Sequence, residues 1–281
     1  MLDWGKQQLR LQPVSNYRIS YLRLGDGGNQ VVLLIHGGGT WLYSFRHLFA
    51  PLAEAGFTVL ALDMPGHGWT RTNHGFRPNY SLGMMIRVIS EFLDSQGVSS
   101  PVHFVGNSWG GGWALHFAQM HPRRVASLSL LAASGFRHPE VWLYESLRYP
   151  IVGELSTWLV NRRTARSFYR CAFFNTELVS EQMVDEAYAP ISKNWENRRA
   201  QYRLMRNLDW RETEARMGQT QTPTLVLWGK QDRLWPVSLA HRFGDRLPNV
   251  RLELFDRCGH LPHEEMPETT RDTLLKFWSN L

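Results

Sequence analysis

The sequence is poor in cysteine and contains no long hydrophobic run. Only two cysteines, Cys171 and Cys258, occur among the 281 residues, so we expect a reducing compartment and no structural disulfide framework. No apolar stretch is long enough to form a transmembrane helix. Residues 1–6 also lack the basic-then-apolar order of a secretory signal. We therefore expect a cytoplasmic protein without a membrane span.

The sequence also lacks a concentration of charge of one sign. Lys and Arg outnumber Asp and Glu by 31 to 25, but the basic residues are scattered, so nucleic acid is not an expected partner. The glycine-rich residues 37–39 lack both the Gly-Lys-Ser/Thr ending of a P-loop and the spacing of a dinucleotide fingerprint. We expect a small-molecule substrate and no cofactor. Whether the chain forms a homo-oligomer stays open.

The hydrophobic residues that are present, 43% of the chain, suffice for a large core and one α/β domain with an insertion. Residues 8–11 and 17–22 alternate polar with apolar side chains, as half-exposed antiparallel strands do. Continuous apolar runs then alternate with helical segments such as residues 80–94, which predicts a mostly parallel, doubly wound sheet. These runs are residues 31–35, 57–62, 102–105, 125–131, 224–228 and 251–255.

The alternation stops between residues 134 and 220, where no strand-like run occurs. We predict a helical cap there, and a core made of residues 1–133 and 221–281. Most cap aromatics are expected to pack within the cap, and a minority to face a pocket. The amphipathic segments that indicate helices are residues 141–147, 151–160 and 180–189.

A nucleophile elbow is indicated by the pattern Gly106-x-Ser108-x-Gly110, between a predicted strand and a predicted helix. The turn in such an elbow is so tight that side chains two residues before and after the serine would collide with the backbone. Ser108 would then project above the sheet. The N–H of Trp109, and N–H groups of the glycine loop after residue 35, would face a developing oxyanion.

Two further loops follow predicted strands and carry an acid and a base. Asp232 follows residues 224–228, and His260 follows residues 251–255. Both lie at the carboxyl edge of the sheet, where Ser108 also lies, and the order Ser108, Asp232, His260 is the one associated with this elbow. Asp256 is the alternative acid. His263 is the competing base, and a metal pair with His260 lacks an apparent third ligand.

These segments together resemble an α/β-hydrolase of the capped, epoxide-hydrolase-like branch, over nearly the whole chain. The resemblance implies that Ser108 is the nucleophile, His260 the general base and acid, and Asp232 its orienting carboxylate. It places Gly38, with Gly39 as a further candidate, beside Trp109 in the oxyanion hole. Haloalkane dehalogenases and epoxide hydrolases of this family have aspartate at the position of Ser108, so those two activities are disfavoured.

Three functions remain open at this point. The first is hydrolysis of carboxylic esters with small or medium apolar acyl groups, through an acyl-enzyme. The second is C–C bond hydrolysis, by resemblance to the meta-cleavage product hydrolases, although those usually have tryptophan where this chain has Leu261. The third is a non-catalytic ligand receptor. Candidate substrate contacts are Trp41, Phe136, Trp142, Trp235 and Leu261.

Overall fold

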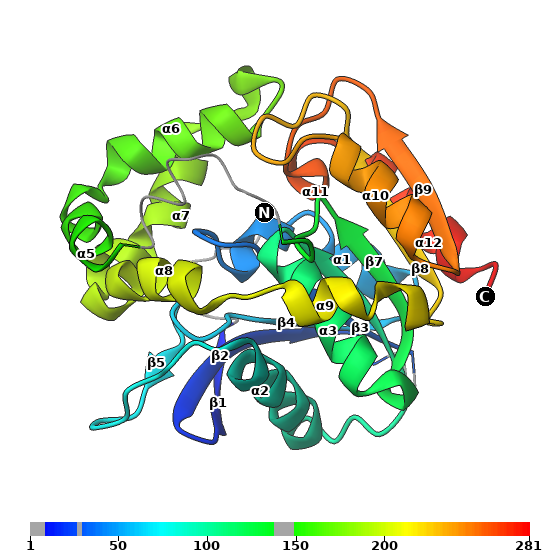
Figure 1. The fold of residues 1–281 in the computed structure, drawn as a ribbon, viewed down its shortest axis with the longest axis horizontal. Coiled ribbons are helices and arrows are strands. Elements are labelled where there is room, and N and C mark those ends of the chain that lie inside the picture. The colour runs from blue at the N-terminus through cyan, green and yellow to red at the C-terminus, as the bar shows by residue number, and fades with distance from the viewer. Residues whose placement is uncertain (1–8, 27–29, 138–148) are drawn as a thin grey trace.

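A nine-stranded sheet forms the centre of the molecule (Figure 1). The structure is a computed structural model, and it describes residues 9–26, 30–137 and 149–281. The strands run in the order β1-β2-β4-β3-β6-β7-β8-β9, with β5 paired to β2. They are β1 (Arg10–Val14), β2 (Tyr17–Leu24), β3 (Val31–Ile35), β4 (Thr58–Leu62), β5 (Arg71–Thr72), β6 (Val102–Asn107), β7 (Val125–Leu131), β8 (Thr224–Gly229) and β9 (Val250–Phe255).

The sheet is parallel from β4 to β9 and antiparallel only where β2 meets β1, β4 and β5. The predicted mostly parallel α/β fold is therefore confirmed. The apolar runs behave as strands covered on both faces should. In β3, Leu33 and Ile35 join one hydrophobic core, and Val32 and Leu34 join the core on the opposite face.

Helices cover both faces of this sheet. Helices α2 (Leu82–Ser95), α3 (Trp109–Met120) and α10 (Ser238–Arg246) contribute to one core, and α1 (Phe49–Glu54) and α12 (Pro267–Trp278) contribute to the other. The spacing of apolar residues predicted α2. Its helix begins at the N-cap Ser81, whose hydroxyl accepts a hydrogen bond from the Met84 N–H. The remaining short elements of the core are η1 (Leu42–Phe45), η2 (Pro122–Arg124) and α11 (Pro262–Glu265).

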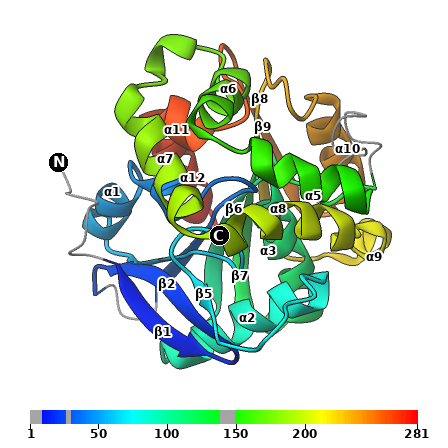
Figure 2. The same ribbon diagram turned by 90° about the vertical axis from the view of Figure 1, so that its left-hand side faces the viewer.

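The segment between β7 and β8 contains only helices in its described residues, and we call residues 149–220 the helical insertion. Figures 1 and 2 show its longer helices grouped on one side of the sheet. The stretch predicted at residues 141–147 lies outside the described residues. The insertion comprises α5 (Pro150–Leu159), α6 (Arg162–Ala172), η3 (Thr176–Leu178), α7 (Glu181–Lys193), α8 (Trp195–Asn207), α9 (Arg211–Ala215) and η4 (Met217–Gln219).

Candidate active site

Ser108 lies at the join between β6 and α3, in a backbone conformation that few non-glycine residues adopt. Its φ is +51° and its ψ is −119°, a strained geometry of the kind that concentrates at functional sites. A Cβ atom on Gly106 would lie 2.5 Å from the carbonyl carbon of Gly110, and one on Gly110 would lie 2.1 Å from the oxygen of Ile35. Only glycine therefore fits at either position of this turn.

His260 and Asp232 are hydrogen-bonded to each other at the same edge of the sheet. The distance between Nδ1 of His260 and Oδ2 of Asp232 is 2.7 Å, and both side chains are buried. The other carboxylate oxygen of Asp232 accepts hydrogen bonds from the N–H groups of Leu234 and Trp235, at 2.8 and 2.9 Å. These two N–H groups hold the carboxylate in one orientation. Because a carboxylate oxygen only accepts hydrogen bonds, Nδ1 of the His260 ring is the donor in the bond to Asp232.

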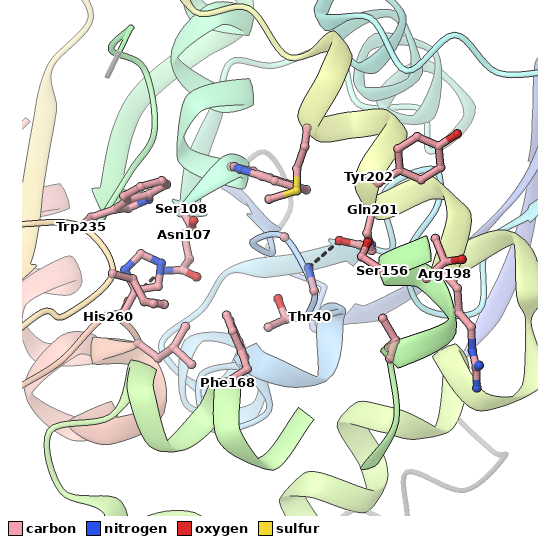
Figure 3. Close-up of a pocket in the computed structure, with 18 residues that line it drawn as sticks. Thr40, Asn107, Ser108, Ser156, Phe168, Arg198, Gln201, Tyr202, Trp235 and His260 are labelled. Carbon is pink, nitrogen blue, oxygen red and sulfur yellow. Dashed lines mark hydrogen bonds between the residues drawn. The ribbon is translucent and has the colours of Figure 1, made fainter. Parts of the chain in front are cut away.

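Ser108 and His260 line one cavity of about 260 Å³, and Figure 3 shows them together at one end of it, with Trp235 beside them. Loops of the sheet edge supply one side, among them Gly38, Gly39 and Trp109. The helical insertion supplies the other, with Ser156, Thr157, Val160, Phe168, Arg198, Gln201, Tyr202 and Met205. The sheet edge and the insertion thus enclose the serine and the histidine together.

Two backbone N–H groups of this cavity are free to donate. Within the described chain, neither the Gly38 N–H nor the Trp109 N–H donates to another protein group. The Gly39 N–H, in contrast, donates to the side-chain oxygen of Gln201 on α8, at 3.0 Å. Gly38 and Trp109 therefore each offer a donor that no described protein group uses, whereas the Gly39 donor already holds the glycine loop against the insertion.

Three side chains that sequence reasoning gave no role connect these loops. The amide of Asn107 donates to the carbonyl oxygens of Leu131 and His260, at 3.0 and 3.1 Å. The carboxylate of Glu265 accepts from the N–H groups of Gly259, at 2.7 Å, and Phe174, at 2.5 Å. Gln201 is the third. Asn107 lies inside the glycine-serine motif and can be noticed there, whereas Glu265 and Gln201 carry no local signal.

The predicted substrate contacts divide into two groups. Trp235 and Leu261 line the cavity. Trp41 does not, because its buried ring stacks on Tyr43 and its N–H donates to the carbonyl of Glu186 at 3.0 Å. Phe136 packs on Phe243, with ring centroids 4.5 Å apart, and lies outside the cavity as well. Trp142 lies outside the described residues.

The competing acid and base of the sequence interpretation are held elsewhere. Asp256 is exposed and accepts from the side-chain amide of Gln231. His263 is fully buried, stacks on Phe45 and has a pKa that burial holds well below its usual range. No cluster of three His, Cys, Asp or Glu side chains within the described ranges is arranged to hold a metal ion.

Two loop residues of the core, Asp63 and His67, act as braces within the structure. Asp63 is buried, and its carboxylate accepts from the N–H groups of Leu42 and Trp69, at 2.9 and 2.8 Å. Burial raises the pKa of this carboxyl to about 6. His67 is buried next to His36, with ring centroids 4.8 Å apart. Neither Asp63 nor His67 lines the cavity, so both serve to join loops beneath the site.

Comparison with known proteins places this arrangement in a family. The sequence profile described as "alpha/beta hydrolase fold" matches residues 30–267. The chain is 27% identical to a 2-hydroxy-6-oxononadienedioate/2-hydroxy-6-oxononatrienedioate hydrolase of Comamonas testosteroni, over 95% of this chain and 93% of the other. It is 26% identical to the monoacylglycerol lipase abhd6-B of Xenopus laevis, over 98% and 83% of the two chains.

Solved structures agree with the sequence matches. A serine hydrolase involved in carbazole degradation superposes with a TM-score of 0.79 and is 25% identical, with 97% of this chain and 99% of the other covered. None of the helices in the described ranges is long and apolar enough to cross a membrane. The fold, the family profile and the relatives agree, and the chain belongs to the alpha/beta hydrolase fold family.

Proposed function

We propose that the protein is a serine hydrolase in which Ser108 is the nucleophile, His260 the general base and acid, and Asp232 the residue that orients the histidine. The observation that supports this most is the 2.7 Å hydrogen bond between His260 Nδ1 and Asp232, in a cavity that also contains Ser108. With Nδ1 bonded to the carboxylate, Nε2 is the nitrogen left to take a proton from the serine.

The reaction that follows from these roles has two halves. His260 takes the proton of the Ser108 hydroxyl as the oxygen forms a bond to the substrate carbonyl carbon. When the carbon–oxygen bond to the alcohol breaks, the imidazolium returns that proton to the leaving alcohol. Water, activated by the same histidine, then attacks the acyl-enzyme and releases the carboxylic acid. The Asp232 carboxylate stabilises the imidazolium formed in each half.

The oxyanion is assigned to the N–H groups of Gly38 and Trp109. Both donors lack protein partners in the described chain, whereas the donor of Gly39 is bonded to Gln201. A donor left unpaired in a buried cavity is costly unless a ligand or transition state uses it. Each such donor contributes about 10²–10³-fold to the rate in comparable enzymes.

We propose carboxylic esters with small to medium apolar acyl groups as the substrates, with the helical insertion acting as a cap. The walls near Ser108 carry mainly apolar side chains, including Phe168, Leu234 and Trp235. Arg198 is the one cationic side chain among the described lining residues. Its guanidinium donates to the Tyr188 hydroxyl and the Ile191 carbonyl, and Figure 3 shows it directed away from Ser108. This favours a neutral substrate over a carboxylate.

A second candidate is hydrolysis of a C–C bond in a 2-hydroxy-6-oxo-dienoate. It is favoured by the Comamonas testosteroni relative, whose name gives a 2-hydroxy-6-oxo-dienedioate as the compound hydrolysed, and by the glycine triplet at residues 37–39. Such a substrate carries a carboxylate, and a carboxylate in a cavity needs a cation or several N–H donors. Turning Arg198 inward would meet that need, at the loss of its bonds to Tyr188 and Ile191.

The experiment that separates the candidates compares two substrate classes on the same preparation. We expect p-nitrophenyl esters of short and medium chain length to be hydrolysed with a higher kcat/KM than a 2-hydroxy-6-oxo-dienoate. The opposite order would support the C–C hydrolase. An Arg198→Gln variant adds a control. Loss of the guanidinium should leave the rate of ester hydrolysis within about threefold of wild type. The same loss should abolish dienoate turnover if the arginine binds the carboxylate of that substrate. Inertness to both classes would contradict the proposed function.

A further inference from the structure

Helix α5 exposes its apolar side chains and buries small ones, which is the reverse of an ordinary surface helix. Five large apolar side chains point outward, namely Ile151, Val152, Leu155, Trp158 and Leu159, and we call them the α5 apolar face. Ile151 is 76% exposed and Trp158 is 69% exposed. At 100° per residue the five positions fall within an arc of about 120°. An ordinary amphipathic helix buries such a stripe in the core.

The inward side of the same helix carries small or polar residues. Gly153 and Thr157 are buried, and Ser156 and Thr157 line the active-site cavity. Glu154 pairs with Arg199 of α8 at 2.8 Å, so the helix is fixed in this rotation. The sequence analysis expected most cap aromatics to pack within the cap, whereas Trp158 of this helix lies on the outside. The cause is that the small residues occupy the face toward the cavity.

Basic side chains adjoin this apolar face. Trp158 packs against Trp195 of α8 in a tilted arrangement, with ring centroids 4.9 Å apart. Trp195 in turn lines a groove of about 530 Å³, together with Phe76 and three arginines, Arg77, Arg199 and Arg203. Glu196 is the one acidic side chain among the described residues of that groove. An exposed apolar patch therefore continues into a surface of positive charge.

We propose that the α5 apolar face and the neighbouring arginine groove form a docking surface for an anionic phospholipid bilayer. Apolar side chains with tryptophan at their edge insert into the headgroup region, and arginines attract anionic headgroups. Contiguous exposed apolar side chains of this kind mark an interaction site in a soluble domain. A second copy of the chain fits less well, because a two-fold contact on this face would bring the arginine grooves of both copies together.

Docking on this surface would turn the outer face of a cavity wall toward the lipid. Ser156 and Thr157 line the cavity from the inner side of the helix that would contact the bilayer, and Figure 2 shows α5 on the side facing the viewer. This consequence for substrate supply rests on the proposed function. Vesicle binding does not rest on the proposed function, so the docking proposal and the proposed function can fail independently of each other.

Vesicle co-sedimentation tests the proposal directly. Wild-type protein is expected to pellet with vesicles of phosphatidylcholine that contain about one-third phosphatidylglycerol, and less with phosphatidylcholine alone. A double variant, Leu155→Ser with Trp158→Ser, should lose at least about tenfold in partition coefficient. Arg77→Gln with Arg203→Gln should reduce binding to the anionic vesicles to the level seen with phosphatidylcholine alone.

A control variant removes two exposed apolar side chains elsewhere on the surface. Leu11 and Leu178 are 56% and 44% exposed and lie outside the α5 apolar face, so Leu11→Ser with Leu178→Ser should bind vesicles like the wild type. Thermal unfolding of each variant verifies folding without reference to activity. Wild-type protein that does not bind, or an α5 variant that binds unchanged, would overturn the proposal. A dimer that only the α5 variant converts to monomer would assign this face to self-association instead.

Discussion

The turn that carries Ser108 and the loop that carries His260 are held in place by different means. The serine turn, residues 106–110, is shaped by its own glycines and held by the neighbouring strands of the sheet, since the Ser108 N–H donates to the Leu131 carbonyl of β7 at 3.0 Å. The histidine loop, residues 256–261, is held by partners distant in sequence. The His260 N–H donates to the Ala172 carbonyl at 2.7 Å, and Glu265 joins Gly259 to Phe174.

This difference separates contacts within the sheet from contacts with the helical insertion. The serine turn is held by strands of the central sheet, whereas the histidine loop is bonded to the end of α6 in the helical insertion. A Cβ atom on Gly259 would lie 2.2 Å from the Ala172 oxygen, so the contact between loop and insertion is also close in space. The insertion therefore both lines the cavity and holds the loop of His260.

The largest effect is expected at the serine turn. Ser108→Ala removes the hydroxyl of the proposed nucleophile, and kcat/KM for an ester should fall by at least about 10⁴-fold. The substitution should not unfold the protein, because alanine keeps the Cβ and removes only the hydroxyl. Steady-state kinetics beside thermal unfolding would measure both. A variant that keeps full activity would remove Ser108 from the mechanism.

The next prediction tests which carboxylate, Asp232 or Asp256, orients His260. In Asp232→Asn the amide retains the side-chain shape, but it no longer stabilises an imidazolium, so kcat should fall by about 10³–10⁴-fold. Asp256→Asn is the matched control on the same loop as His260, and it should change kcat by less than about threefold. If Asp256→Asn were the more damaging of the two, the assignment of the acid would be reversed.

A pH-dependent effect on stability is expected at His36, the residue directly before the glycine loop. Nε2 of the buried His36 accepts from the Met64 N–H at 3.0 Å, and burial lowers the pKa of His36 to about 4. The unfolded chain takes up this proton below about pH 6.5 and the folded chain does not. The stabilisation that depends on a neutral His36 is thus fully present above pH 6.5, and it is lost as the pH falls toward 4.

The contribution of His36 is measured by comparison with a variant that cannot titrate. From pH 7 to about pH 4, wild-type protein should lose up to about 3 kcal/mol more unfolding free energy than His36→Gln. Urea denaturation of both proteins across this range provides the measurement. Groups common to both proteins cancel in the difference. Parallel pH profiles for the two would show that His36 is not held neutral in the fold.

The smallest effect sharpens the account of the histidine loop. Glu265→Gln replaces an oxygen that accepts from backbone N–H groups by an NH₂ group that cannot accept, so His260 should lose its fixed position. We expect kcat to fall by about tenfold with KM within about twofold. Glu268→Gln, at an exposed position of α12, is the control. Equal kinetics for both variants and the wild type would show that Glu265 does not position the base.

The fold was predictable from the sequence because its signals are local. Residues 31–35 are apolar throughout and form a strand buried on both faces, and the amphipathic period of residues 80–94 forms α2. The elbow was predictable for the same reason, since Gly106, Ser108 and Gly110 are close in sequence. The hydrogen bond between His260 and Asp232 follows the predicted order of loops along the sheet edge.

The remaining parts of the site depend on contacts that no local pattern encodes. Gln201 reaches Gly39 across 162 positions of sequence, and Phe168 enters the cavity because α6 lies over it. Counting aromatics did not distinguish Phe168 from Phe136, which packs on Phe243 of α10 instead. The period of apolar residues in α5 correctly indicated a helix, but period alone does not state which face is buried.

The central claim is that Ser108 forms a covalent intermediate, activated by His260 and Asp232. The most direct measurement is the site of reaction with a fluorophosphonate, which phosphonylates activated serines, read by intact-mass and peptide mass spectrometry. One phosphonyl group is expected on the wild-type protein, located on Ser108, with none on Ser108→Ala and a much slower reaction in Asp232→Asn. A label on any other residue, or equal labelling of the Ser108→Ala variant, would contradict the account.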